Sequence, residues 1–351
     1  MKFTRLPIRT GPSGNQFFIP VYFFKGKNPK AKKAYFQSSI HGAEVQGNAL
    51  IFSLIEIFKE NPPLGDVTLV PLANPIGMDR KTGEYTDGRF DPVTGENWNR
   101  AYLSYDLKKF KGVLEVAEVK FQMKKQIEKR LRLNLRFAEK LALTLQSMAV
   151  QADLVLDLHN ANVSVDYLYA NEACLDDALY LGFQYIISIP PLFSGALDEA
   201  ISAPWSKLKE EFGVKHELAP QSYTLELGAQ EQLSMKKAEL QAKGVIEFLK
   251  RHGVVKGKTK RPNDAFVCEL KNYVTVYAPS GGLYEYRAKL GEILRKGGEL
   301  AAQLNFKETG GVLSSIKVQE EFIPILHYSS ASVSEGDELF KGFTKWRVLR
   351  P

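Results

Sequence analysis

The chain has 351 residues, a formal net charge of +7, and hydrophobic and charged fractions of 44% and 25%. These values are typical of a globular protein that is large enough to hold more than one domain. No long uncharged apolar run predicts a membrane span, and residues 1–20 lack the residue order of a signal peptide. Cys174 and Cys268 lie far apart in the sequence, which indicates neither a disulfide framework nor a cysteine metal site. We therefore expect a cytoplasmic protein without a membrane partner.

The predicted elements alternate between strands and helices through the first part of the chain. Apolar runs rich in β-branched and aromatic residues predict strands, at residues 17–24, 34–40, 67–72, 153–158 and 223–227. Residues 43–59 are typical of an apolar helix. Strands separated by helices predict an α/β fold, in which helices flank a mostly parallel, mixed sheet. Ligands of such sheets collect at the carboxyl ends of the strands.

Residues 106–151 form a basic segment. Between Lys108 and Lys140, eleven Lys or Arg stand against four Glu, and this difference of seven equals the net charge of the chain. The spacing of the apolar residues predicts one or two amphipathic helices with a basic outer face. Such a face is most often simply solvated. The alternatives are a lid that attracts anionic substrates and a nucleic-acid surface. Few aromatic residues and no recognisable binding module lead us to expect no nucleic-acid partner.

The composition changes near residue 256, where G-K-T-K-R-P-N is typical of a linker. Short β-runs and glycine-containing turns follow. They predict a small β-domain of barrel or sandwich type over residues 261–351, after a larger domain at residues 1–256.

Three polar residues stand where parallel strands would bring them together. H-G-A-E sets His41 and Glu44 three residues apart at a strand-to-helix junction, and D-L-H-N ends an apolar strand with His159. Two imidazoles and a carboxylate suit zinc and leave a fourth position for water. Taken singly, His159 would be a buried structural histidine and Glu44 a residue that favours a helix N-terminus. Together they predict one zinc ion per chain.

Glu226 lies within the apolar strand S-Y-T-L-E-L-G, where a carboxylate is costly to bury without a purpose. A carboxylate that does not ligate the metal can act as general base and acid beside a zinc-bound water. The alternative is a salt bridge to an arginine.

In this order the motifs resemble the succinylglutamate desuccinylase/aspartoacylase family, a branch of the zinc carboxypeptidase-like hydrolases. H-G-A-E resembles the family's H-G-x-E, D-L-H-N its D-x-H, and T-L-E-L-G the strand with the catalytic glutamate. A-N-P at residues 73–75, followed by Asn99 and Arg100, resembles the family's substrate-binding stretch. The resemblance implies a zinc carboxypeptidase-like fold followed by a lipoyl-like β-domain. The segment at residues 106–151 has no motif that carries over.

The resemblance also implies roles for single residues. Asn99 and Arg100 would grip a substrate carboxylate. Arg89 would polarise the scissile carbonyl, with Arg80 as its rival. Asp157 lies on the same strand face as His159 and would either orient an imidazole or make a structural hydrogen bond.

Two further positions concern the substrate. Some family members carry an arginine about ten residues before the catalytic glutamate, whereas this chain has Lys215 and His216 in that stretch. His216 is therefore the substrate-binding candidate there, and a dicarboxylate substrate is not expected. Tyr284, in the turn G-G-L-Y-E-Y, would either reach into the active-site mouth or pack in the small β-core.

The sequence thus predicts a zinc-dependent hydrolase that cleaves an amide bond next to a free carboxylate, by deacylating a small N-acyl amino acid or a related metabolite. One alternative is a metallo-carboxypeptidase that acts on short or cell-wall-derived peptides with the same residues. Another is a non-catalytic metal-binding scaffold, against which the unligated Glu226 argues. The sequence leaves a homo-oligomeric state open.

Overall fold

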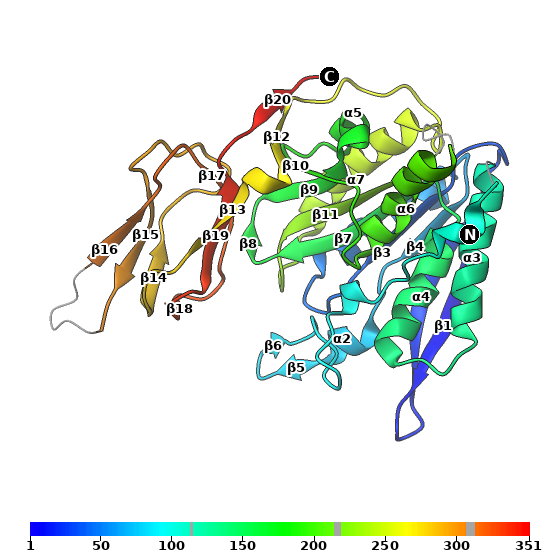
Figure 1. Ribbon diagram of the computed structural model, residues 1–351, viewed down its shortest axis with the longest axis horizontal. Helices are drawn as coiled ribbons and strands as arrows, with labels where there is room; N and C mark the ends of the chain where they lie inside the picture. Colours follow the sequence, from blue (N-terminus) through cyan, green and yellow to red (C-terminus); the bar gives the residue numbers. More distant parts are fainter. Residues whose placement is uncertain (113–114, 214–218, 307–312) are drawn as a thin grey trace.

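The computed structural model describes residues 1–112, 115–213, 219–306 and 313–351 (Figure 1). Its central feature is a ten-stranded sheet in which parallel and antiparallel neighbours are mixed. The predicted α/β fold with a mixed sheet is confirmed. Neighbouring strands of this sheet are, in order, β1 (Lys2–Thr10), β2 (Gln16–Phe24), β4 (Val67–Val70), β3 (Ala34–Ser38), β7 (Leu154–Ala161), β11 (Gln221–Ala229), β9 (Asp166–Asn171), β10 (Tyr185–Ile189), β12 (Ala265–Glu269) and β20 (Arg347–Leu349).

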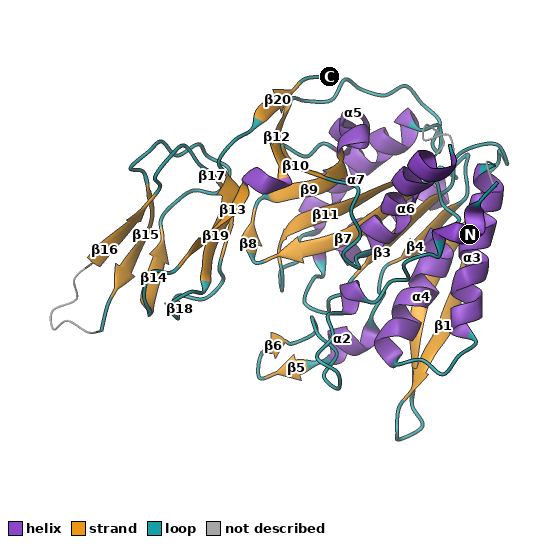
Figure 2. Cartoon of the chain, viewed as in Figure 1, coloured by secondary structure: helices purple, strands orange, loops and turns teal. Residues whose placement is uncertain are grey.

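Helices cover both faces of the sheet (Figure 2). The pair α1 (Gln46–Glu60) and α7 (Met235–Arg251) packs on one face. On the other face lie α4 (Phe137–Ala149) and α6 (Leu197–Phe212), with α3 (Val116–Leu131) against α4. Within the described residues, no helix is both long enough and apolar enough to cross a membrane. Shorter helical elements are α2 (Pro75–Asp79), α5 (Leu175–Ala178), η1 (Trp98–Arg100), η2 (Leu107–Phe110), η3 (Glu172–Cys174), η4 (Leu179–Leu181) and η6 (Leu270–Asn272).

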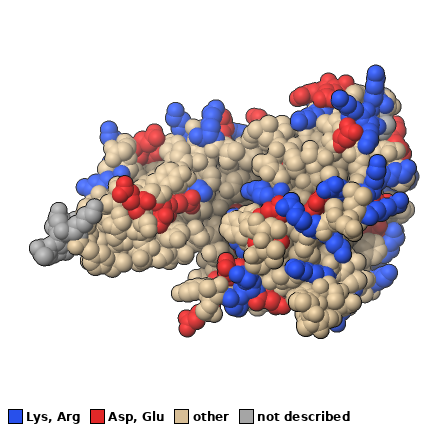
Figure 3. All heavy atoms as spheres, turned by 60° about the horizontal axis from the view of Figure 1, so that its bottom comes forward, with Lys and Arg blue, Asp and Glu red and all other residues tan. Residues whose placement is uncertain are grey.

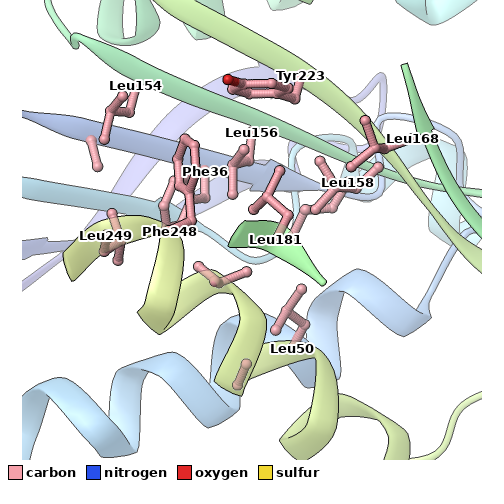
Figure 4. Packing of buried hydrophobic residues seen from close by; sticks show 14 of the residues in the cluster. Phe36, Leu50, Leu154, Leu156, Leu158, Leu168, Leu181, Tyr223, Phe248 and Leu249 are labelled. Carbon is pink, nitrogen blue, oxygen red and sulfur yellow. The ribbon is translucent and has the colours of Figure 1, made fainter. Parts of the chain in front are cut away.

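The alternation of side chains along β7 decides which face of the sheet carries polar residues. Leu154, Leu156 and Leu158 pack with residues of α1 and α7 in one buried hydrophobic cluster (Figure 4). Because successive side chains of a strand point to opposite faces, Asp157 and His159 lie on the other face, which α4 and α6 cover.

The basic segment forms η2, α3 and α4, so the structure has two α-helices where one or two were predicted. On α3, Val119, Met123 and Ile127 are buried in the cluster shared with α4. Lys and Arg side chains gather at the end of the molecule that carries these helices (Figure 3). Lys120 is different, because it is buried and its ammonium group pairs with Asp153.

The C-terminal region contains two four-stranded antiparallel sheets, which agree with the predicted small sandwich. The first consists of β13 (Tyr273–Tyr277), β19 (Glu338–Phe343), β17 (Ile323–His327) and β8 (Val163–Ser164). The second consists of β16 (Leu313–Lys317), β15 (Glu299–Leu304), β14 (Gly282–Tyr286) and β18 (Ser332–Val333). A separate two-stranded hairpin is formed by β5 (Lys81–Thr82) and β6 (Tyr85–Thr86).

The predicted boundary between residues 256 and 261 does not coincide with the strand pairing. β12 pairs with β10 of the large sheet, and β20 pairs with β12. The reason is that Ala265 and Val267 of β12 are buried in the core cluster beneath the large sheet. By strand pairing the smaller unit therefore begins at β13, and we call residues 273–343 the C-terminal β-unit. It is joined to the rest by β8, which pairs with β17.

Candidate metal centre and active site

The predicted ligand pair lies in the loop between β3 and α1, which close backbone packing holds in place. A Cβ atom at Gly42 would lie only 2.1 Å from the carbonyl oxygen of Gly77, so only glycine fits there. The Gly42 N–H donates to the carbonyl of Gly88 (3.0 Å), which fixes the segment before Arg89 beside this loop. Asn74 caps α2 and donates from Nδ2 to the Ile40 carbonyl (3.0 Å). The A-N-P motif thus has a structural role here.

His41, Glu44 and His159 form a buried cluster. Nδ1 of His41 lies 2.9 Å from Oε1 of Glu44, and Nδ1 of His159 lies 2.7 Å from Oε2. One ligand atom from each residue lies within 4.8 Å of the others, and the three residues are only 2–4% exposed. The structure therefore brings the three predicted ligands together, and the cluster could hold a metal ion.

The charges in the cluster favour a cation. Burial opposes ionisation of Glu44, but the charges and hydrogen bonds of His41 and His159 hold its pKa below the usual range. Burial also opposes protonation of His159, yet Asp157 and Glu44 raise the pKa of its imidazole well above its ordinary value. Because ligand nitrogens can hold either a proton or a metal ion, metal binding here competes with protons.

Both imidazoles have a second partner on the nitrogen that faces away from Glu44. Nε2 of His41 lies 2.8 Å from Oδ1 of Asn97, and Nε2 of His159 lies 2.9 Å from Oδ2 of Asp157. Asp157 in turn accepts a hydrogen bond from Nε2 of Gln37 (2.9 Å). The Nδ1 atoms are thereby left for a metal. The sequence indicated Asp157 as a partner of an imidazole but did not indicate Asn97 or Gln37, because no motif assigns either residue to this role.

Glu226 lies beside the cluster on the neighbouring strand. It pairs in register with His159, so the two side chains project from the same face of the sheet. Burial raises the pKa of Glu226 to about 7, with Glu44 adding to the effect and His159 opposing it. Its Oε2 atom is buried without a hydrogen-bond partner among the described residues. A carboxyl group with this pKa can accept and return a proton near neutral pH.

Of the two rival arginines, Arg89 reaches the cluster and Arg80 does not. Nη1 of Arg89 donates to Oε1 of Glu44 at 3.1 Å, and the Arg89 side chain is 52% exposed. Nε of Arg80 lies instead 3.7 Å from a carboxylate oxygen of Asp87. The exposed guanidinium of Arg89 can therefore turn toward a ligand without leaving the site.

The short helix η1 places Asn99 and Arg100 next to the cluster. Asn99 is buried, with Nδ2 3.2 Å from Nε2 of His159. Its backbone N–H donates to Oδ1 of Asn97 (2.9 Å), the same oxygen that contacts His41. Arg100 is exposed and donates from Nη1 to the Asn99 carbonyl (2.7 Å). A buried amide and an exposed guanidinium thus stand side by side at the site.

Comparison with known proteins shows to which family the chain belongs. Residues 30–251, more than half of the chain, match the family described as the succinylglutamate desuccinylase/aspartoacylase catalytic domain. The chain belongs to this family. A solved structure assigned to the same family, from Shewanella frigidimarina NCIMB 400, is 36% identical with a TM-score of 0.95, and 100% of this chain and 99% of that chain are covered. A second, from Shewanella amazonensis SB2B, is 36% identical with a TM-score of 0.94, covering 99% and 100%.

More distant structures share the fold. The product-bound ectoine utilization protein EutE (DoeB) from Ruegeria pomeroyi is 19% identical with a TM-score of 0.72, covering 98% of this chain and 94% of that chain. A mutant form of murine aminoacylase 3 is 13% identical with a TM-score of 0.55, covering 93% and 98%. None of the curated proteins compared with the chain matches it. Membership of this hydrolytic deacylase family supports an amidohydrolase, and the shared fold confirms the predicted carboxypeptidase-like architecture.

Two predicted substrate residues of this family member remain, and only one of them lies in the described part of the chain. His216 falls in residues 214–218, outside the described part of the chain. Tyr284 is buried in the hydrophobic cluster of the C-terminal β-unit, where its hydroxyl donates to the Ser280 carbonyl (2.7 Å). The structure therefore has Tyr284 packed in the small β-core and not directed into the active-site mouth.

Proposed function

We propose that this protein is a zinc-dependent hydrolase that cleaves an amide bond next to a free carboxylate, and that it removes the acyl group from a small N-acyl amino acid. One observation carries the proposal: Glu226 has a pKa of about 7 and lies beside a three-residue ligand cluster that it does not join. A metal-binding scaffold has no use for such a carboxyl group. The deacylase family of the chain supports the same reaction class.

The donor set suits zinc. His41, Glu44 and His159 would hold the ion through two imidazole nitrogens and a carboxylate oxygen, and Asn97 and Asp157 would fix the two rings. When bound, zinc acts as a Lewis acid and lowers the pKa of water in its open position to about 7.

The remaining chemistry belongs to side chains of this chain. Glu226 would accept the proton of the attacking water and deliver it to the leaving nitrogen. Arg89 would direct its guanidinium to the scissile carbonyl oxygen as negative charge develops there. Asn99 and Arg100 would hold the free carboxylate of the substrate, for which a guanidinium supplies two parallel hydrogen bonds.

The proposal is tested by incubating the purified, zinc-loaded protein with a panel of N-acyl amino acids and short peptides and by measuring release of free amine. We expect cleavage of N-acyl amino acids with kcat/KM well above that for peptides. Cleavage of peptides alone would identify a carboxypeptidase. Stoichiometric zinc without cleavage of either class would identify a scaffold.

Removing the Arg100 guanidinium should raise KM about 10-fold to 100-fold and change kcat little. Hydrogen bonds to charged groups contribute about 1.5–3 kcal/mol, and the carboxylate is bound equally in the ground and transition states. Steady-state kinetics of Arg100→Ala check this, with Arg80→Ala as control, because Arg80 pairs with Asp87 and not with the cluster. A fall in kcat with unchanged KM would contradict the role.

Substrates whose leaving amino acid has a neutral or cationic side chain should be cleaved faster than N-acetylaspartate. The chain has Lys215 and His216 before the Glu226 strand, and neither can form the planar fork of an arginine with a second carboxylate. The basic helices would steer anions toward the protein, which adds rate more than discrimination. Values of kcat/KM across an N-acetyl amino acid series provide the measurement. A series led by N-acetylaspartate or N-succinylglutamate would disprove this prediction.

A further inference from the structure

Two tyrosines line the site on the side of Glu226 that faces away from the metal ligands. β9 runs antiparallel to β11, and in this register Tyr167 pairs with Glu226 and Tyr169 with Thr224. Directly opposite residues of an antiparallel pair project from the same face of the sheet. Both tyrosines therefore stand on the face that carries Glu226 and His159.

A third tyrosine comes from the C-terminal β-unit. Tyr273 begins β13, the first strand of the C-terminal β-unit (Figure 1). Its ring centroid is 6.3 Å from that of Tyr167 and 6.4 Å from that of Tyr169, while the latter two are 5.7 Å apart. The β-unit thus completes a wall of three aromatic rings next to the general base.

Ring packing alone does not explain why these three positions are tyrosine, because phenylalanine would pack in the same way without a hydroxyl group. The Tyr273 hydroxyl is buried and makes no hydrogen bond of normal geometry with the described residues, and the same holds for Oε2 of Glu226. Burial, followed by the negative charge of Glu226, raises the pKa of Tyr167 and of Tyr169. The hydroxyls therefore remain neutral donors at physiological pH. The three hydroxyls also interact with one another, and these contacts contribute to the pKa shifts of all three tyrosines. The buried Tyr273 hydroxyl is costly unless one of these neighbours, a ligand or water satisfies it.

The order of strands assigns this wall to one side of the scissile bond. Asn99, which would hold the carboxylate of the amino acid, contacts His159 on β7. Glu226 follows on β11, and the tyrosines follow on β9. An amide placed at Glu226 with its carboxylate toward Asn99 therefore has its acyl group toward the tyrosines.

This inference rests on the proposed function: we propose that Tyr167, Tyr169 and Tyr273 form the wall of the site that recognises the acyl group, and that this wall donates a hydrogen bond to a neutral oxygen on the acyl chain. The preferred substrates are then N-(hydroxyacyl) or N-(oxoacyl) amino acids, in preference to simple N-alkanoyl ones. An acyl group with its own carboxylate is disfavoured, because it would place a second negative charge beside Glu226.

The test compares N-glycolyl and N-propionyl derivatives of one neutral amino acid, which differ only by a hydroxyl in place of a methyl group. A site built to bind a hydroxyl rejects the analogue that lacks it, so we expect kcat/KM for the glycolyl amide to be at least about tenfold higher. Tyr273→Phe should remove most of this preference. Tyr185→Phe is the matched control, because Tyr185 lies in the same aromatic cluster but donates to the Gly291 carbonyl (2.8 Å).

The outcomes separate the two proposals. Equal cleavage of both amides, or faster cleavage of the propionyl amide, overturns the acyl pocket while leaving the hydrolase intact. A preference for the glycolyl amide that survives in Tyr273→Phe also overturns it. If Tyr273→Phe does not fold, Tyr169→Phe removes a hydroxyl from the same wall. It should then also lose most of the preference for the glycolyl amide. Failure to cleave any N-acyl amino acid disproves the proposed function itself.

Discussion

Glu226→Gln should keep its zinc and lose turnover by roughly 100-fold or more, the scale of lost acid–base assistance. The amide has nearly the shape of the carboxylate but cannot accept the proton of the attacking water. Glu226 is not one of the clustered ligand residues, so metal content should stay at one ion per chain. Steady-state kinetics and elemental analysis of the same preparation measure both quantities. An active Glu226→Gln enzyme would show that a group other than Glu226 is the general base.

The pH profile provides a second readout for Glu226. In the wild type, kcat/KM should fall as pH drops through the pKa of Glu226, because the base becomes protonated. That pKa is about 7 without a bound cation, and a divalent ion nearby favours the carboxylate and lowers it. The fall that reports Glu226 should be absent in Glu226→Gln, in which only the competition between protons and the metal ion can lower activity in acid. Glu231→Gln is the control, since Glu231 follows the same strand but binds Thr86 of the β5–β6 hairpin.

His159→Ala should abolish stoichiometric zinc binding while the fold is retained. His159 supplies one of three ligands, and it stands at the carboxyl end of β7 beyond the leucines that fill the core. Loss of an outer-shell partner typically weakens metal binding about 10-fold to 100-fold, and loss of a direct ligand should cost more. Zinc titration monitored by calorimetry, with circular dichroism for the fold, measures the effect.

Two further variants calibrate the result for His159. Asp157→Asn changes the group that faces Nε2 of His159 and should weaken zinc binding by about 10-fold to 100-fold. His327→Ala removes a histidine of the C-terminal β-unit, which stacks on Tyr286, and should leave zinc affinity unchanged. One tightly held zinc ion in His159→Ala would exclude this residue as a ligand.

The central strands, the fold class and the candidate ligand set could be predicted from the amino-acid sequence. Apolar runs predicted β3, β7 and β11 because strands buried on both faces have to be apolar almost throughout. Burying a polar or charged side chain within or next to such a run is costly without a function. His41, His159 and Glu226 therefore stood out against their apolar neighbours. The order of the motifs supplied the family, which the comparisons confirm.

Long-range packing selects which residues from outside the motifs join the site, so these residues could not be predicted from the sequence. The sequence favoured Arg89 and left Arg80 as its rival, and contact between Gly42 and Gly88 brings Arg89 to Glu44. The change in composition near residue 256 could not show that β12 belongs to the large sheet, because its pairing with β10 depends on distant partners.

The tyrosine wall also could not be predicted from the sequence. Tyr167 and Tyr273 lie far apart in the chain, and each alone is an ordinary strand tyrosine. Tyr167 is a neighbour of Glu226 because β9 pairs with β11, and Tyr273 joins Tyr167 because the C-terminal β-unit packs on the same sheet face. Strand periodicity fixes which face a side chain takes, but it cannot state which distant element covers that face, since this choice is made by long-range packing.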